Sequence, residues 1–512
     1  MTRRRTPCQA LRTAVVALVF LGAATFPPLR VSGQESTATP LSQIERKNKA
    51  PVSRDVLSVK IPKAFETRLK NGLAVLIVED HRFPAVHVEL HLRAAGALFE
   101  PSKSPGLASA TAQMLREGTQ TRTSEQIAEE IEKLGATLSA SAGFGSPETV
   151  LGASGLSSNF DSWFAAATDV LLHPSFPAEE LAKLKQRLKV QLREQRSAAG
   201  FLSEERFRGA VFGGHPAAVV APTLESVEAL TREALARWHR ERYAPADSIL
   251  AVVGDVRAAE LIPKLEKSLS AWQTAEVKEA LPPNAAPASA RKVYIVDRPN
   301  SVQTVVVLGD IAIDRRSADY IPLVVMNHLF GGSSSARLFL NLREEKGYTY
   351  GVYSSFNAGE YPGPWRVGGS MRTEVTDGAL IEFFREIRRI RDEKVPEAEL
   401  EQSKRSLVAS FALALEQPSR TLAFALTRKI YGFPDDYWDT YPGKIMAVSA
   451  DDVQRVARKY FNPETMQIVA VGDGRKIQPI LEKYAAVEVY DSAGKPLRPP
   501  EKSPEKSIER AP

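Results

Sequence analysis

Residues 73–78 form a short apolar run, and apolar and polar residues alternate over residues 85–92, and both segments read as β-strands. Apolar residues then recur at helical spacing over residues 106–117, 124–134 and 178–196. Strands followed by a group of helices predict an α+β sandwich. We therefore expect a sheet with helices packed on it in the first half of the chain.

An internal repeat extends this prediction to the second half. Residues 231–255 and 449–473 align without gaps at an offset of 218, and each reads as an amphipathic helix followed by an apolar strand that ends in Gly-Asp. Residues 176–188 and 395–407 align at an offset of 219. Two matches at nearly the same offset indicate a duplication. The sequence thus predicts two homologous α/β sandwich lobes.

Local composition sets the boundaries of these lobes. Residues 274–290 contain three prolines and no periodicity, as linkers do. The last residues are rich in Pro, Lys and Glu, a composition typical of disorder. We expect a signal peptide at 1–33, a flexible lead-in at 34–55, a first domain at 56–273, a linker at 274–290, a second domain at 291–490 and a disordered tail at 491–512.

The N-terminus has the pattern of a signal peptide. Arginines at positions 3–5 precede an apolar run from Ala14 to Phe26 that is too short to span a bilayer, and small residues follow at 31–33. An uncleaved anchor is the alternative. The only cysteine, Cys8, lies before the apolar run, so the mature chain needs no disulfide. We predict export to the periplasm or to the outside of the cell.

The charge of the chain does not indicate a nucleic-acid partner. The formal net charge is +6, and the first 33 residues hold five arginines and no acidic residue. Removal of this segment subtracts five charges from +6 and leaves +1. With 43% hydrophobic and 25% charged residues, the composition is that of a globular protein.

The most informative string is GLASATAQMLREGT, at residues 106–119. It resembles the active-site helix of the pitrilysin/insulinase family, which typically reads G-L-A-H-x-x-E-H-M-L-x-x-G-T. The resemblance extends over roughly 64–490, in particular to bacterial two-domain members and to the mitochondrial processing peptidase subunits. Here Ser109 and Gln113 stand where the family has histidines, and Ala112 stands where it has glutamate.

These three changes remove the chemistry that the resemblance would otherwise imply. Residues at i, i+3 and i+4 share one helix face, so Ser109, Ala112 and Gln113 point the same way. Serine and an amide are poor zinc ligands, and alanine cannot take a proton from a zinc-bound water. Glu194 in KVQLREQ is the counterpart of the family's third ligand, although a glutamate on a charged helix is also an ordinary solvated residue. We expect no catalytic zinc at this helix.

A second set of potential ligands lies in HVELH, at residues 87–91. His87, Glu89 and His91 share one face of the expected strand and could bind a metal. A strand with polar residues on its half-exposed side explains the pattern equally well. The order of the residues also differs from the inverted zinc motif, which requires a helix.

The second half retains a different part of the family pattern. GGSSSARLFLNLREEKGYTYGVYSSF, at residues 331–356, resembles the C-terminal domain of the family, in which an Arg and a Tyr seven residues apart contact the substrate. The matching residues are Arg343 and Tyr350, which carry hydrogen-bond donors for a peptide carbonyl or an oxyanion. The alternative is structural: Arg343 pairs with Glu344 or Glu345, and Tyr350 fills a core.

The resemblance implies two lobes that form a clamshell chamber. Some bacterial members of the family pair a subunit that has the zinc motif with one that lacks it but has the Arg and Tyr, and this chain fits the second description. We therefore expect a non-catalytic, peptide-binding subunit of an exported zinc metallopeptidase, without a cofactor of its own, whose zinc-bearing homologue performs endoproteolysis. One alternative is a structural or peptide-binding scaffold with no role in proteolysis. A peptidase that uses His87, Glu89 and His91 is another.

Overall fold

The computed structural model describes residues 59–273, 277 and 281–497. The described residues do not include the expected signal peptide and lead-in. They also do not include residues 274–276 and 278–280 of the expected linker or residues 498–512 of the expected tail. Residues 491–497 were also expected to be disordered. In the structure they form a turn that returns along the last strand, and the backbone N–H of Leu497 donates to Val489 O (2.7 Å). The start of the predicted tail is therefore wrong, because this hydrogen bonding extends the fold to Leu497.

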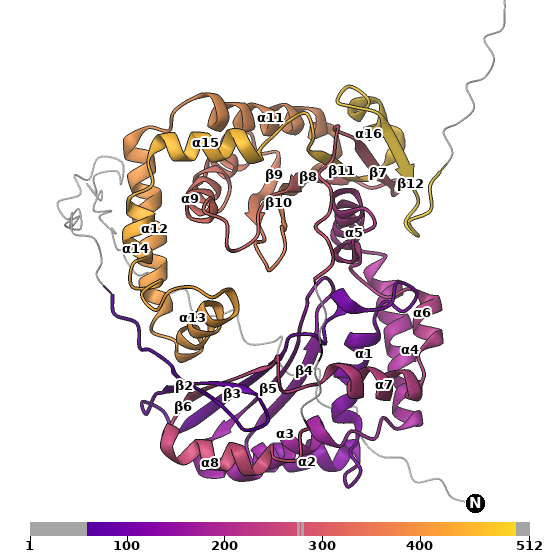
Figure 1. Cartoon of the computed structure of the whole chain (residues 1–512). Helices are drawn as coiled ribbons and strands as arrows, with labels where there is room; N and C mark the ends of the chain where they lie inside the picture. Colours follow the sequence, from indigo (N-terminus) through magenta and orange to yellow (C-terminus); the bar gives the residue numbers. More distant parts are fainter. Residues whose placement is uncertain (1–58, 274–276, 278–280, 498–512) are drawn as a thin grey trace, which may run out of the picture. The chain divides into compact units, whose positions relative to one another are not determined.

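The first lobe contains a six-stranded sheet (Figure 1). Its strand order is β1-β2-β6-β3-β5-β4, with β2 and β6 parallel and the other neighbours antiparallel. Its strands are β1 (Phe65–Arg68), β2 (Ala74–Glu79), β3 (Ala85–Leu92), β4 (Thr137–Ala142), β5 (Thr149–Leu156) and β6 (Ile249–Gly254).

The second lobe contains a sheet of the same design, in the order β12-β7-β11-β8-β10-β9. The five strands from β7 to β9 in this order match the five strands from β2 to β4 in the order of the first sheet. Only the first edge differs, because β1 is antiparallel to its neighbour whereas β12 is parallel. The strands are β7 (Val293–Asp297), β8 (Gln303–Ile311), β9 (Thr349–Phe356), β10 (Pro364–Arg372), β11 (Gln467–Gly472) and β12 (Val487–Tyr490).

The helices repeat as the strands do. In the first lobe they are α1 (Leu107–Met114), α2 (Ser124–Lys133), α3 (Phe160–Leu172), α4 (Ala178–Gln195), α5 (Ala199–Phe212), α6 (Leu224–Ala229), α7 (Arg232–Arg242) and α8 (Ala258–Ser268). In the second lobe they are α9 (Tyr320–Phe330), α10 (Arg337–Phe339), α11 (Thr376–Asp392), α12 (Glu397–Ala414), α13 (Pro418–Tyr431), α14 (Tyr441–Met446), α15 (Ala450–Tyr460) and α16 (Gly474–Leu481).

The boundaries of equivalent helices confirm the duplication. The offset of 219 carries α4 onto α12 and α5 onto α13, and the offset of 218 carries α7 onto α15, each from first residue to last. The helix caps repeat too: Thr231 Oγ1 accepts from Ala234 N (3.2 Å), and Ser449 Oγ accepts from Asp452 N (3.1 Å). The two α+β lobes predicted from the sequence are thus present.

Each sheet has one face covered by helices of its own lobe. In the first lobe, alternate residues of β3 such as Val86, Val88 and Leu90 are buried in a core with helices that include α1 and α3. Figure 1 shows α2, α3 and α8 along this side of the sheet. The period-2 pattern in the sequence therefore marks the true inner face of β3.

The other face of the second sheet is covered by α5, which belongs to the first half of the chain. Phe207 and Val211 of α5 are buried against Val307 of β8 and Val469 of β11. Gly309 of β8 allows this close approach, because a Cβ there would lie 2.8 Å from the Phe207 ring.

The equivalent helix α13 makes the reciprocal contact. Leu422 and Leu426 of α13 are buried with Leu76 of β2 and Val253 of β6 on the other face of the first sheet. The two halves thus exchange one helix each. In the described part of the chain, no helix is long and apolar enough to cross a membrane.

Candidate functional site

Helix α1 is held at its N-terminus by a half-buried carboxylate. Glu100 accepts hydrogen bonds from the backbone N–H groups of Gly106 (2.8 Å) and Ala108 (2.6 Å). Burial raises the pKa of Glu100 to about 7, against the two N–H donors, which lower it. Gly106 has a φ of 95°, and a Cβ there would lie 2.8 Å from Pro222, so this entry to the helix requires glycine.

The three substituted positions lie on one side of α1, as the spacing predicts. Gln113 Nε2 donates a hydrogen bond to Ser109 Oγ (3.2 Å), and Ala112 between them is fully buried. Glu194 is exposed on α4, beside a surface hollow that Arg187 and Val190 line. Among the described residues, no hydrogen bond or ion pair joins the Glu194 side chain to α1. The hydroxyl of Ser109, the amide of Gln113 and the methyl group of Ala112 do not form a ligand set for a zinc ion.

The strand residues His87, Glu89 and His91 form a hydrogen-bonded network instead of an open set of ligands. His87 Nε2 and Glu89 Oε1 are 2.9 Å apart, and His91 Nε2 and Glu89 Oε2 are 3.3 Å apart. Glu148, from the loop between β4 and β5, contacts the second nitrogen of His91 at 3.1 Å. Within residues 59–273, 277 and 281–497, no group of three or more His, Cys, Asp and Glu residues is arranged to hold a metal.

The charges in this network stabilise one another. Burial opposes protonation of His91, but its hydrogen bonds to Glu148 and Glu89 outweigh this and raise its pKa to about 9. The hydrogen bonds from His87 and His91 lower the pKa of Glu89 to about 2. Since both nitrogens of His91 face carboxylates, the imidazolium form fits the geometry.

The segment that carries Arg343 has an unusual backbone. Leu340–Glu345 form a π-helix, in which Lys346 N donates to Asn341 O (3.0 Å). Gly347, with a φ of 62°, then turns the chain into β9. Arg343 Nη1 donates to Tyr350 O (2.5 Å), so a direct hydrogen bond spans the seven-residue interval.

A buried polar cluster holds this turn against α11. Asn341, which is 6% exposed, donates through Nδ2 to Glu382 Oε2 (2.8 Å) and Glu386 Oε1 (2.9 Å) of α11. Arg385 and Arg389, one turn further along α11, pair with these two carboxylates. The turn is therefore attached to α11 by a residue two positions from Arg343.

A β-bulge turns Tyr350 outward. Val352 and Thr349 of β9 oppose Gly369 and Met371 of β10, so β9 has one residue more than its partner at this point. Thr349 Oγ1 accepts from Gly351 N (3.1 Å) and donates to Ser370 O (2.6 Å), which holds the bulge. Tyr350 is consequently 86% exposed.

These contacts test the structural alternative, in which Arg343 pairs with a neighbouring glutamate and Tyr350 fills a core. Arg343 does pair with Glu344, at 3.3 Å, but both side chains are exposed. The idea that Tyr350 fills a core is wrong, because the bulge moves its side chain out of the buried row of β9. The sequence placed the two residues seven apart, and the π-helix and the bulge present both at the surface.

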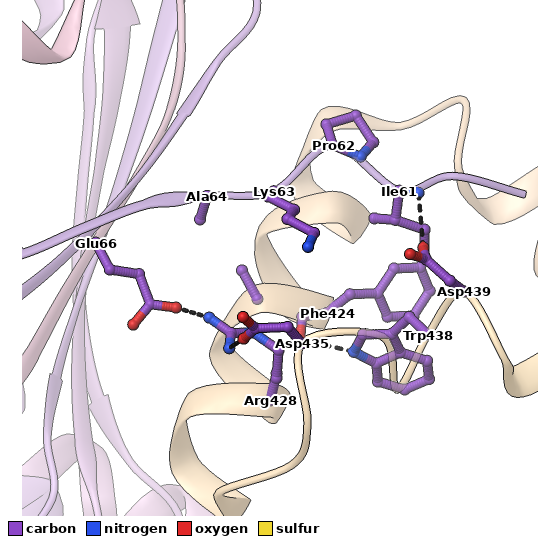
Figure 2. A pocket seen from close by; sticks show the side chains of 11 residues that line it. Ile61, Pro62, Lys63, Ala64, Glu66, Phe424, Arg428, Asp435, Trp438 and Asp439 are labelled. Atoms are coloured by element: carbon purple, nitrogen blue, oxygen red, sulfur yellow. Dashed lines mark hydrogen bonds and ion pairs between the residues drawn. The ribbon is translucent and has the colours of Figure 1, made fainter.

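A cavity of about 330 Å³ lies elsewhere, between the residues before β1 and the region around α13 (Figure 2). Figure 2 shows Ile61 N donating to Asp439 Oδ1 (3.0 Å), which ties the segment just before β1 to the second half of the chain. Arg428 of α13 pairs with both Glu66 of β1 and Asp435. This cavity was not predicted, because its walls come from segments more than 350 residues apart.

Comparisons with known proteins place these sites within a family. Residues 74–216 match the model of the insulinase family, peptidase family M16, and residues 229–407 match the model described as the peptidase M16 inactive domain. The first match contains Ser109, Ala112 and Gln113, and the second contains Arg343 and Tyr350.

Individual relatives agree with these matches. An uncharacterized zinc protease of Rickettsia bellii is 24% identical over 415 residues, which cover 79% of this chain and 96% of the relative. A probable mitochondrial-processing peptidase subunit beta of Schizosaccharomyces pombe is 28% identical over 219 residues, which cover 42% of this chain and 46% of the relative.

Solved structures show the same fold. The structure described as the peptidase M16 inactive domain from Pseudomonas fluorescens has a TM-score of 0.75 and 25% identity, over 80% of this chain and 98% of that one. A protease from Helicobacter pylori has a TM-score of 0.74 and 18% identity, over 81% of this chain and 100% of that one. The chain belongs to the pitrilysin/insulinase family of peptidases, family M16. It is a peptidase-like protein whose second half matches the domain described as inactive.

Proposed function

We propose that this chain is a non-catalytic, peptide-binding subunit of an exported zinc metallopeptidase. It pairs with a homologue of the same family that holds the zinc, and it supports endoproteolysis by that partner. The observation that carries the proposal is a contrast between the lobes. The first has Ser109, Ala112 and Gln113 in place of zinc ligands and base, whereas the second presents Arg343 and Tyr350 at its surface.

The chemistry of the two exposed residues suits a bound peptide. Arg343 uses Nη1 on Tyr350 O, and its guanidinium carries further N–H donors for a peptide carbonyl or a developing oxyanion. The hydroxyl of Tyr350, whose side chain is exposed, supplies another donor. Because Asn341 and the bulge fix the backbone on both sides, that backbone is already ordered before a peptide binds, which reduces the conformational entropy lost on binding.

Export is part of the same proposal. It is supported by the arginines and the short apolar run at the N-terminus, followed by small residues at 31–33. N-terminal sequencing of the protein from the native cell tests it. A mature chain that begins at or near Gln34 is expected, in the periplasmic or external fraction.

The central test compares the purified chain alone with the chain co-expressed with a zinc-motif homologue. The chain alone should retain no stoichiometric zinc and should not cleave peptides. The pair should cleave them, and Arg343→Ala in this chain should lower kcat/KM about 10- to 1000-fold, the range for loss of one transition-state donor. Arg388→Ala, which removes an exposed arginine of α11, is the matched control and should leave cleavage unchanged.

Two outcomes would redirect the assignment. Chelator-sensitive cleavage by the isolated chain contradicts the non-catalytic role. A chain that binds peptides but leaves the cleavage by every co-expressed homologue unchanged is a peptide-binding scaffold. The observation that favours the scaffold function is again that Ser109 and Gln113 stand in place of zinc ligands.

A further inference from the structure

The face of β9 and β10 opposite their buried side chains carries an exposed ring, Tyr353, next to two glycines. Val352 and Ser354 of β9 are buried, so Gly351, Tyr353 and Ser355 occupy the opposite face. Across the register, Gly368 lies opposite Tyr353 and Arg366 lies opposite Ser355. Tyr353 therefore has Gly351 and Gly368 as its nearest neighbours on this face, with Ser355 and Arg366 beyond them.

The position of the Tyr353 ring is defined by its neighbours. Its centroid lies 5.6 Å from that of Phe339, which is buried, and Tyr353 itself is 51% exposed. The Arg343 guanidinium lies 5.0 Å from the centroid of the same Phe339 ring. Phe339 is thus the shared support of Arg343 and Tyr353.

Glycine at position 351 leaves the ring this place. A Cβ on Gly351 would lie 3.2 Å from Cε2 of Tyr353, closer than ordinary packing. Gly368, on the neighbouring strand, likewise adds no side chain beside the ring. The exposed part of the ring is therefore bordered by the glycine backbone on the sheet side and by Phe339, which also contacts Arg343, on the other.

We infer that Tyr353, supported by Phe339, is a specificity-determining residue that receives a bulky apolar or aromatic side chain of the peptide. The inference rests on the proposed function, because it takes Arg343 and Tyr350 as the residues that hold the peptide backbone beside it. Ring-to-ring and ring-to-aliphatic contacts favour such a side chain. Arg343 already pairs with Glu344, and Arg366 pairs with Glu204, so a charged side chain beside Tyr353 would lose hydration without gaining an ion pair with either arginine.

The test measures peptide binding as well as cleavage. Peptides that differ only by Phe, Leu, Ala, Lys or Glu at one position, moved along the sequence, are titrated by fluorescence anisotropy against the full mature chain and against its pair with the zinc-bearing homologue. At one position Phe and Leu should bind about tenfold more tightly than Ala, the size expected for an apolar subsite. Tyr353→Ala should reduce this ratio to near one, and Tyr353→Phe should keep it.

The controls separate this inference from the proposed function. Phe83→Ala removes an exposed ring of the first lobe, which is 65% exposed, and should leave the Phe-to-Ala ratio unchanged. Arg343→Ala should weaken all peptides by a similar factor and so preserve the ratio. If Tyr353→Ala also weakens all peptides equally, or changes none, Tyr353 is no specificity residue and the inference is overturned. If Arg343→Ala leaves cleavage by the pair unaltered, the proposed function fails, whatever Tyr353 does.

Discussion

His91 shows how single residues set the electrostatics of the first lobe. The pKa of His91 is raised from an ordinary 6.5 to about 9, so its contribution to stability is complete below pH 6.5 and is lost as the pH rises through 9. The pKa of Glu89 is lowered from 4.5 to about 2, so its contribution is present above pH 4.5 and is lost as the pH falls through 2. Both contributions are complete between about pH 4.5 and 6.5.

The first prediction at this scale follows from that window. His91→Gln should lower the free energy of unfolding by about 1–3 kcal/mol at pH 6, because Glu89 and Glu148 lose a charged donor. The difference from the wild type should shrink as the pH approaches 10. Urea denaturation at pH 6, 8 and 10 measures it. His173→Gln, which breaks an exposed pair with Asp169, is the control and should cost less than about 1 kcal/mol. A difference independent of pH contradicts the assigned charge state.

The sequence pattern predicted contacts between side chains of one strand or helix better than contacts between side chains from different parts of the chain. Period-2 spacing placed His87, Glu89 and His91 on one face of β3, and the structure agrees. Their fourth member, Glu148, comes from a loop 57 residues beyond His91, and no local pattern indicates it. The same holds for Tyr353: the string YGVYSSF shows its place on the polar face of β9, but its support by Phe339 depends on tertiary packing.

At the scale of elements, the π-helix and the bulge present Arg343 and Tyr350. Neither was predicted, because both depend on contacts with other elements. The π-helix is attached to α11 through Asn341, and the bulge exists only in the register of β9 against β10. In contrast, α1, α2 and α4 were predicted within a few residues, since their apolar spacing is continuous over two turns or more.

The second prediction concerns the attachment of the π-helix. Asn341→Leu removes the donor shared by Glu382 and Glu386 and leaves two buried carboxylates without it. We expect a loss of about 2–4 kcal/mol in the free energy of unfolding, measured by urea denaturation. In the assembled pair, the misplaced turn should also lower kcat/KM as Arg343→Ala does.

A matched control lies on the same turn. Glu345→Gln changes an exposed charge and should alter the stability by no more than about 0.5 kcal/mol. An Asn341→Leu variant as stable as the wild type would show that Asn341 does not hold the turn.

At the scale of the whole molecule, the exchanged helices matter most. The sequence repeat covered α4 and α7 and their counterparts α12 and α15, but it did not reach α5 and α13, and an amphipathic helix does not specify which sheet it covers. In the structure each covers the sheet of the other half, with Phe207 and Leu426 among the buried side chains. The predicted linker at 274–290 is therefore not the only connection between the halves.

The third prediction tests this connection. A chain with a site for a specific protease inserted in 274–290 should yield two fragments that elute together in native gel filtration after cleavage. They should separate only under denaturing conditions, because separation exposes the apolar sides of α5 and α13 and the sheet faces beneath them. Fragments that separate without denaturant contradict the exchange. The uncleaved chain under the same conditions is the control.

The helix exchange also determines how the chain loses its structure. Unfolding of either lobe uncovers a face of the other lobe's sheet. Neither lobe therefore keeps its native free energy of unfolding once the other has unfolded. Heat should therefore unfold both cores in a single cooperative transition, although the chain has the length of several ordinary domains. In calorimetry, the van't Hoff enthalpy should approach the total heat absorbed.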